Sequence, residues 1–284
     1  MRYALISDIH ANLEALDAVL ADIDARGDRE TVYHLGDLVG YSSSPNDVID
    51  RLRARAIAGV AGNYDSTVAT DYKHCGCKSE TPQQEALAHL SYEYTRGAVT
   101  DVHKRYLGGL PFSIDLRPHG GHAPGPRLVL VHGTPTLNTL YFTADRSDDF
   151  CRKMAAIVGL GAGDALAFGH THKPWHRIVD GVHFINTGSV GRPKDGDWRA
   201  GYVCVDLGGG DARVEFVRVP YDVQATVRGV RAAQLPEEFA ALLLSGGAPA
   251  PTADASPSFA AVFRESRARA PASTAIVGVE GSLT

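Results

Sequence analysis

Histidine and aspartate side chains recur in this chain at the points where apolar, strand-like segments end. The segment "ALISDIH" ends on Asp8 and His10, "LVLVHG" contains His132, and "ALAFGHTH" contains His170 and His172. Imidazole and carboxylate groups bind divalent transition metals. Ligands bind beyond the carboxyl ends of parallel strands, where such side chains converge. The pattern therefore predicts a metal centre at one edge of a sheet.

Two further polar residues follow strand-like segments, namely Asp37 in "HLGDLVG" and Asn63 in "AGNYDS". Neighbouring strand ends lie about 5 Å apart, so all of these side chains can converge on one small volume. Their oxygen and nitrogen donors, without thiolate, suit Mn, Fe, Zn, Co or Ni. Seven ligands are too many for one open catalytic ion, but they suffice for two ions if one carboxylate bridges them. We interpret the other histidines of these segments and loops as structural or surface residues: His34, His89, His103, His119, His122, His176 and His183.

Strand and helix patterns alternate in the first part of the chain. Strand-like segments "YALIS", "TVYHL" and "AIAGVAG" are separated by helical patterns over residues 12–27 and 44–55. This order predicts a parallel sheet with right-handed crossovers. Helices are also expected from residue 81 to about 96, near 100–107, over 148–160 and over 236–247. Antiparallel strands dominate after residue 182, so we expect two mixed sheets packed face to face with helices outside.

Composition and charge exclude few functions but favour an ordinary enzyme. The chain has 284 residues and a net charge of -5, which does not argue for nucleic-acid or anionic-membrane binding. No segment approaches about 20 uninterrupted apolar residues, so no membrane span is expected. The apolar stretch at the N-terminus is too short for a secretory signal, and a cytoplasmic protein is the default. Cys75 and Cys77 are expected to be reduced thiols, with a soft-metal or redox site as the alternative.

The composition changes near the C-terminus. The segment "GAPAPTADASPS" is rich in Ala, Pro and Ser, which is typical of a flexible linker or tail. We therefore expect one domain over residues 1–245 and a tail over residues 246–284.

The ordered segments "DIH", "GDLVG", "GNYD", "VHG" and "GHTH" resemble the five motifs of the calcineurin-like metallophosphoesterase superfamily. The short helical inserts, "NTGSVGRPKDGD" and "VRVPYD" are similar to its small bacterial phosphodiesterase-type branch. The resemblance implies an α/β fold, a four-layer α/β/β/α sandwich. It also implies two divalent metal ions, with Mn preferred over Fe, Zn, Ni and Co.

Carried over motif by motif, the resemblance assigns the ligands to two ions. One ion is held by Asp8, His10 and His172, the other by Asn63, His132 and His170, and Asp37 bridges them. The implied substrate is a phosphate ester, often a diester, with nucleotides and cyclic nucleotides as candidates. A metal-activated hydroxide would attack phosphorus in line, while Asn63 donates its amide to a phosphoryl oxygen. Two alternatives stay open: a protein or small-molecule phosphomonoesterase, and a metal-containing scaffold with little turnover.

One departure from the family motif concerns proton transfer. Tyr64 stands where the motif has a histidine that protonates the leaving group or orients the phosphate. Tyrosine has an ordinary pKa near 10, so it is a poor acid at neutral pH. We expect leaving groups that need little protonation, or another acid such as His74. Asp65 either orients His10 or stabilises the turn in which Asp65 itself lies.

Two cations follow in the segment "GSVGRPKDGD". Arg192 and Lys194 either face phosphate or are solvated loop charges.

Overall fold

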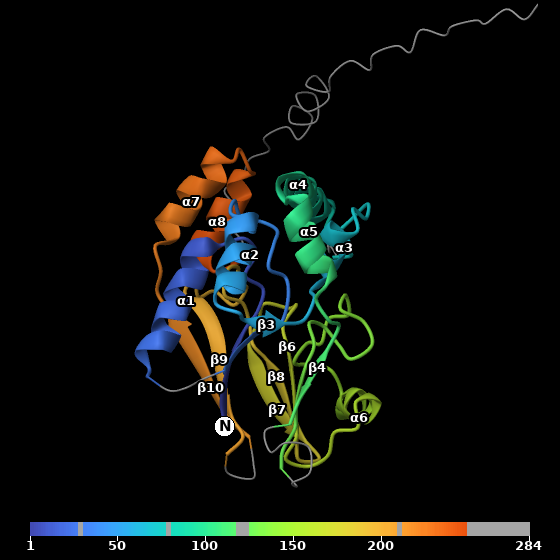
Figure 1. Cartoon of the computed structure of the whole chain (residues 1–284). Coiled ribbons are helices and arrows are strands. Elements are labelled where there is room, and N and C mark those ends of the chain that lie inside the picture. The colour runs from blue at the N-terminus through green and yellow to red at the C-terminus, as the bar shows by residue number, and fades with distance from the viewer. Residues whose placement is uncertain (28–30, 78–80, 118–124, 209–211, 249–284) are drawn as a thin grey trace, which may run out of the picture. The chain divides into compact units, whose positions relative to one another are not determined.

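The computed structural model describes residues 1–27, 31–77, 81–117, 125–208 and 212–248. Most of the expected tail over residues 246–284 therefore lies outside the described residues, and the division at residue 245 stays a prediction. The described residues form ten strands and eight helices, which are labelled in Figure 1. Among these helices, none combines the length and the apolar character that a membrane span requires.

The strands and helices have the following bounds. The strands are β1 (Arg2–Ile6), β2 (Thr31–His34), β3 (Ala58–Gly59), β4 (Ile114–Leu116), β5 (Leu128–Leu130), β6 (Ala165–Phe168), β7 (Trp175–Val179), β8 (Val182–Asn186), β9 (Ala200–Asp206) and β10 (Arg213–Val219). The helices are α1 (Leu13–Ala25), α2 (Pro45–Ala54), α3 (Asn63–Ala69), α4 (Pro82–Ala98), α5 (Asp101–Gly108), α6 (Asp148–Ile157), α7 (Val223–Ala232) and α8 (Glu237–Ser245).

The strands form two five-stranded mixed sheets. The first has the order β10-β9-β1-β2-β3, and the second has the order β4-β5-β6-β8-β7. In the first sheet, β1, β2 and β3 are parallel, while β9 is antiparallel to both β1 and β10. In the second sheet, β5, β6 and β8 are parallel, while β4 and β7 are antiparallel to their neighbours. The predicted parallel arrangement of the first three strands is confirmed.

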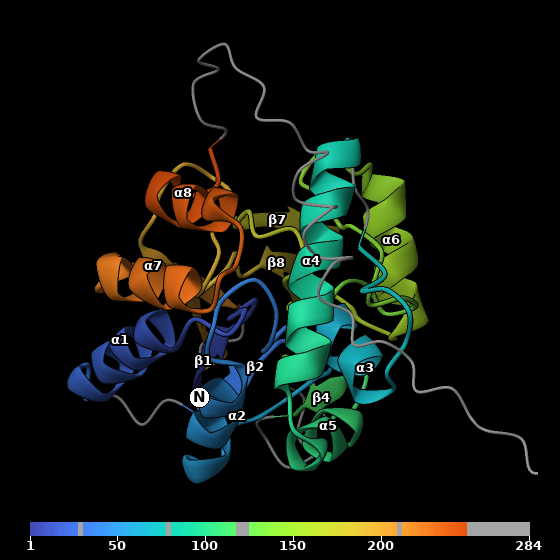
Figure 2. The same cartoon turned by 90° about the horizontal axis from the view of Figure 1, so that it is seen from above.

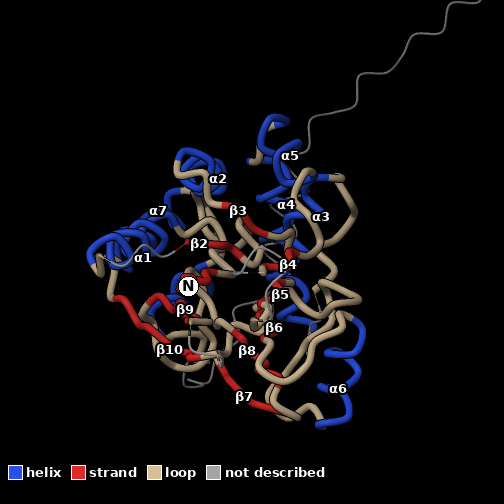
Figure 3. Tube along the Cα trace, turned by 60° about the horizontal axis from the view of Figure 1, so that its bottom comes forward, coloured by secondary structure: helices blue, strands red, loops and turns tan. Residues whose placement is uncertain are grey.

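Buried apolar side chains divide the fold into four layers. A cluster that includes Leu5 and Val205 from the first sheet and Leu130 and Ala167 from the second fills the space between the sheets. A second cluster joins the outer face of the first sheet to α1 and α2. A third joins the outer face of the second sheet to α6, and Figure 3 shows helices on either side of the strands. This is the predicted α/β/β/α sandwich.

Helix α1 illustrates how the sequence specifies one outer layer. Its apolar residues recur at helical spacing and are buried: Leu16, Val19, Leu20 and Ile23. The side chain of Asn12 caps the helix by accepting a hydrogen bond from the backbone N–H of Ala15. The helix therefore starts three residues after His10, and its cap, Asn12, ends the loop that carries this histidine.

The remaining helices surround the carboxyl ends of the central strands. Helix α3 packs against α4 and α5, and α7 packs against α8, as Figure 2 shows. Leu87 and Tyr94 of α4 also pack against the apolar cluster of α7 and α8. Thr81 caps α4 by accepting from the backbone N–H of Gln84, as its sequence predicts. Helices α3 and α7 and strand β7 are not among the elements expected from the sequence.

Candidate metal centre

The structure brings all seven predicted metal ligands into one buried cluster beyond the strand ends. Each of them is at most 4% exposed: Asp8, His10, Asp37, Asn63, His132, His170 and His172. They follow β1, β2, β3, β5 and β6, so both sheets contribute to the cluster. Buried charges and imidazoles at this density need partners, because their desolvation is costly.

The ligand atoms form two groups. Donor atoms of Asp8, His10 and His172 all lie within 4.8 Å of one another, and those of Asp37, His132 and His170 do the same. In the first group, the Nε2 atoms of His10 and His172 are 3.1 Å apart. In the second group, 3.1 Å separates His132 Nε2 from His170 Nδ1. Each group has the size and composition of one metal site.

Asp37 lies between the two groups. Its Oδ2 atom is 3.8 Å from Nε2 of His10 and 3.5 Å from Nε2 of His132. The Oδ1 atom of Asn63 approaches the second group, at 3.2 Å from His132 Nε2. This arrangement is the one that a bridging carboxylate and a terminal amide ligand require, and the ligand roles themselves stay predictions.

Backbone carbonyl groups set the orientation of three imidazoles. A carbonyl can only accept a hydrogen bond, so each Nδ1 atom that faces one carries the hydrogen and leaves the Nε2 lone pair free for a metal. The three contacts are His10 Nδ1 to Val39 O at 3.0 Å, His132 Nδ1 to Leu35 O at 2.7 Å, and His172 Nδ1 to Arg192 O at 2.6 Å.

Two buried atoms of the cluster have no hydrogen-bond partner within the described residues. These are Asp8 Oδ1 and His170 Nε2. An unpaired buried polar atom costs about 1–3 kcal/mol, and a cation bound at Asp8 Oδ1 would remove that cost there. The residues present therefore fit a pair of divalent metal ions.

Burial and closely spaced charges shift the pKa values of the cluster groups. Burial, with help from His172, lowers the pKa of His10 to about 3, and burial with help from His132 lowers the pKa of His170 to about 3. Burial also disfavours a charged His132, but the Asp37 carboxylate outweighs it and raises its pKa to about 9. The imidazoles outweigh burial at Asp37 and hold the pKa of its carboxyl below the ordinary value.

Five of the seven residues have backbone angles in the left-handed region. The φ angles are 51° for Asp8, 50° for His10, 54° for Asp37, 66° for His170 and 60° for His172. Such conformations cost about 1–3 kcal/mol each and persist where surrounding contacts enforce them. Here the backbone N–H groups of Asp8 and His10 donate to the carbonyl groups of Gly36 and Asp37. Concentrated strain of this kind is typical of a functional site.

Asp65 holds the loop of Asp37 rather than His10. Its carboxylate accepts hydrogen bonds from the backbone N–H groups of Gly62, Asp37 and Leu38, at 2.8 to 2.9 Å. Of the two roles expected for Asp65, the contacts favour turn stabilisation, because the Val39 carbonyl orients His10.

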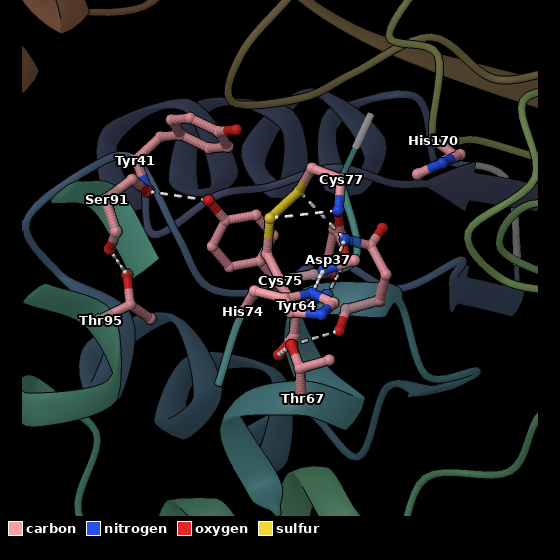
Figure 4. Close-up of a disulfide and its surroundings, with 12 residues drawn as sticks. Asp37, Tyr41, Tyr64, Thr67, His74, Cys75, Cys77, Ser91, Thr95 and His170 are labelled. Carbon is pink, nitrogen blue, oxygen red and sulfur yellow. Dashed lines mark hydrogen bonds between the residues drawn. A yellow bond between two sulfur atoms is a disulfide. The ribbon is translucent and has the colours of Figure 1, made fainter. Parts of the chain in front are cut away.

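Tyr64 packs against the cluster, but its hydroxyl group points elsewhere. The ring is fully buried and lies edge-on to His10, with ring centroids 5.7 Å apart. The hydroxyl donates to Ser91 Oγ of α4 at 3.1 Å, and Figure 4 shows it on the side of the ring away from His170. Burial raises the pKa of Tyr64 well above its ordinary value. This environment disfavours proton donation to a leaving group.

We expect Tyr64→Phe to change kcat on an activated ester by less than about threefold. The variant loses one buried hydrogen bond, so its free energy of unfolding should fall by about 1 kcal/mol. Steady-state kinetics and thermal unfolding measure the two effects. A loss of kcat of more than about a hundredfold, at unchanged metal content, would make Tyr64 a catalytic residue after all.

His74 lies outside the buried cluster. It is exposed, and its Nδ1 atom accepts a hydrogen bond from the backbone N–H of Gly76 at 3.1 Å. Its ring contacts that of Tyr72. The role of His74 as an acid stays a prediction, and this geometry gives it no contact with the seven ligands.

A disulfide bond joins Cys75 and Cys77 beside Asn63, so the expectation of reduced thiols is wrong for this structure. The intervening Gly76 has φ +73°, a turn that brings the two cysteine Cα atoms to 5.3 Å. The Asn63 amide nitrogen donates to the Cys75 carbonyl at 2.9 Å. This bond turns the amide oxygen toward His132, and it competes with the predicted donation to a phosphoryl oxygen.

Arg192, Lys194 and Tyr41 lie next to the first ligand group. The Arg192 guanidinium carbon is 3.8 Å from the centre of the Tyr41 ring, and this ring lies edge-on to His10 at 5.0 Å. The backbone N–H of Lys194 donates to the carbonyl of His172 at 3.2 Å. Tyr41 is not among the residues predicted from the sequence, although it directly follows the motif "GDLVG" that contains the ligand Asp37.

Residues 1–210 match the family model described as the calcineurin-like phosphoesterase superfamily domain. The chain therefore belongs to this superfamily, whose members bind a dinuclear metal centre. An uncharacterised protein of Methanocaldococcus jannaschii is 29% identical over 260 residues, covering 86% of this chain and 97% of that protein.

Solved structures agree with the family assignment. The crystal structure of a metallophosphoesterase from Sphaerobacter thermophilus is 27% identical, with a TM-score of 0.66 over 87% of this chain and 99% of that one. A hypothetical protein from Pyrococcus horikoshii is 22% identical and has the same fold, with a TM-score of 0.73 over 88% of this chain and 99% of that one.

Proposed function

We propose that this protein hydrolyses phosphate esters, with diesters as the main class, at a centre of two divalent metal ions. The observation that carries the proposal is the position of Asp37 between two buried ligand groups. Asp8, His10 and His172 would hold one ion, and Asn63, His132 and His170 the other. Mn is the preferred metal, with Fe, Zn, Ni and Co as alternatives.

The chain's own residues would orient the reaction. When bound, the ions lower the pKa of a coordinated water and neutralise phosphoryl oxygens. The carbonyl groups of Val39, Leu35 and Arg192 hold three imidazoles in the tautomer that binds a metal. The disulfide-bonded segment holds the Asn63 amide, and Asp65 holds the Asp37 loop. These contacts keep the donor atoms in place before substrate arrives.

A metal-content and activity experiment tests the proposal. Purified protein is treated with a chelator, reloaded with Mn²⁺ and analysed for bound metal. It is then assayed with bis(4-nitrophenyl) phosphate and with 4-nitrophenyl phosphate. We expect two ions per chain and metal-dependent cleavage that is faster for the diester. Faster monoester cleavage would favour the phosphomonoesterase alternative, and two bound ions without cleavage of either ester would favour a scaffold.

A further inference from the structure

The loop after β8 contains two cationic residues, Arg192 and Lys194, that are not paired with the two aspartates of the same loop. Asp195 and Asp197 form ion pairs with Arg218 and Arg199. Among the ion pairs of the described residues, none includes the guanidinium group of Arg192 or the ammonium group of Lys194. Both side chains are half-buried. A half-buried cation without a counter-ion is costly, so an anionic ligand is the natural partner.

Two backbone contacts hold the loop that carries these cations beside the metal ligands. The carbonyl of Arg192 accepts from His172 Nδ1, and the N–H of Lys194 donates to the carbonyl of His172. The Arg192 guanidinium lies over the Tyr41 ring, and the N–H groups of a guanidinium can form a bidentate contact with phosphate.

The end of α8 supports the same loop from the other side. The N–H of Gly196 donates to the carbonyl of Gly246 at 3.0 Å. Gly247 lies so close to Lys194 that an added Cβ would be 2.6 Å from the Lys194 Cα. These contacts hold in place the loop that carries Arg192 and Lys194.

The position of Arg192 places positive charge beside the first ligand group. Its guanidinium lies over the Tyr41 ring, and this ring lies edge-on to His10 at 5.0 Å. Lys194 is two residues further along the same loop, and its backbone N–H donates to the carbonyl of the ligand His172. A substrate bound at the ligand groups therefore lies next to this loop.

The environment of Tyr64 restricts the leaving group independently. An alkoxide must be protonated as it leaves, since its conjugate acid is about as weak as water, whose pKa is about 15.7. The Tyr64 hydroxyl donates its hydrogen bond to Ser91 Oγ on α4 and is not directed at a leaving group. A phosphate leaving group has a second pKa of about 6, so it needs positive charge rather than a proton.

We propose that Arg192 and Lys194 form a subsite for a second phosphate, which makes substituted phosphoanhydrides the preferred substrates of this site. This inference rests on the proposed phosphoesterase function. The scissile phosphorus of such a substrate carries two substituents, as in a diester, but the leaving oxygen belongs to a second phosphate. Arg192 and Lys194 hold that phosphate and stabilise the charge that develops on it.

The atoms of the reaction balance as a hydrolysis. A water oxygen forms a bond to the first phosphorus, and the bond from this phosphorus to the bridging oxygen breaks. The electron pair of that bond leaves on the second phosphate. For an anhydride with one ester group on each phosphorus, both products are monoester dianions above about pH 6, and the two water protons pass to the solvent.

Binding of two phosphonates tests the subsite without turnover. Calorimetry with the Mn²⁺-loaded protein gives dissociation constants for methylenebisphosphonate, which offers two phosphonate groups, and for methylphosphonate, which offers one. In Arg192→Gln and Lys194→Gln, the affinity for the bisphosphonate relative to the monophosphonate should fall at least about tenfold, since charge-assisted hydrogen bonds are lost. Lys153→Gln, which removes an exposed charge on α6, should leave the ratio unchanged.

Kinetics on two substrates complete the test. The substrates are P1,P2-dimethyl pyrophosphate, followed by phosphorus NMR, and bis(4-nitrophenyl) phosphate. In both variants, the ratio of kcat/KM for the pyrophosphate to that for the diester should fall at least about tenfold. An unchanged ratio in binding or in kinetics, at wild-type metal content, overturns the subsite. A wild-type protein that binds no Mn²⁺ or cleaves neither substrate instead overturns the proposed function.

Discussion

Replacing Asp37 by Asn should lower kcat on bis(4-nitrophenyl) phosphate by at least about 10³-fold and lower bound metal from two ions to at most one. Asp37 Oδ2 is the atom that approaches histidines of both ligand groups. Asparagine has the same shape but no charge, so the two cations would lose the anion that lies between them. Loss of one preorganised charged contact in an active site costs about 10²–10³-fold in rate, and loss of an ion adds to this.

The change should leave the fold intact. The other carboxylate oxygen of Asp37, Oδ1, accepts a hydrogen bond from the backbone N–H of Tyr64 at 2.9 Å, and the Oδ1 of asparagine can accept the same bond. Elemental analysis, steady-state kinetics and thermal unfolding of the chelator-treated protein separate the effects. Asp47→Asn, on the exposed side of α2, is the matched control. Two bound ions with a loss below about tenfold would contradict the bridging role.

The position of the ligands was predictable because strand order converts distant sequence positions into neighbours. His132 and Asp37 are far apart in the chain, yet both follow parallel strands whose carboxyl ends meet at one edge of the fold. Apolar segments that end on glycine and a metal-binding residue were sufficient to indicate this edge. No detail of side-chain packing was needed for that step.

The direction of each side chain was not predictable in the same way. Tyr64 occupies a motif position next to a predicted ligand, but its hydroxyl finds Ser91 on α4, an element whose docking the local sequence does not specify. Likewise, the contact between Asn63 and the Cys75 carbonyl depends on a turn at Gly76 that only the folded chain reveals. Such contacts depend on tertiary packing rather than on local pattern.

Two helices were missed for different physical reasons. Helix α3, with the sequence "NYDSTVA", is short and largely polar, so it has little hydrophobic periodicity to detect. Helix α7 did carry a signal: Asp222 caps it by accepting from the N–H of Ala225, and Val227 and Val230 are buried at helical spacing. Helix α7 was therefore predictable from its local sequence, whereas α3 is a helix that tertiary contacts stabilise.

Replacing Gly169 by Ala should weaken metal binding at the Asp8 group by about 10- to 100-fold, although Gly169 itself binds nothing. A Cβ atom at this position would lie 2.3 Å from Asp8 Oδ2 and 2.5 Å from Ser7 Oγ. The Asp8 carboxylate cannot retreat freely, because Oδ2 also accepts hydrogen bonds from Ser7 Oγ and the His170 N–H. Changes to the contacts that orient metal ligands cost about 10- to 100-fold in metal affinity.

The same added methyl group should destabilise the metal-free protein by about 1–3 kcal/mol, the usual cost of overpacking. Metal titration and chemical unfolding of the chelator-treated protein therefore measure two separate quantities. Gly161→Ala is the matched control, because no heavy atom lies within 4 Å of a Cβ at that position. If Gly169→Ala kept wild-type metal affinity while losing stability, the carboxylate of Asp8 would not be a ligand. If the variant kept wild-type metal affinity and wild-type stability, the close approach of Gly169 to Asp8 would not hold this carboxylate in position.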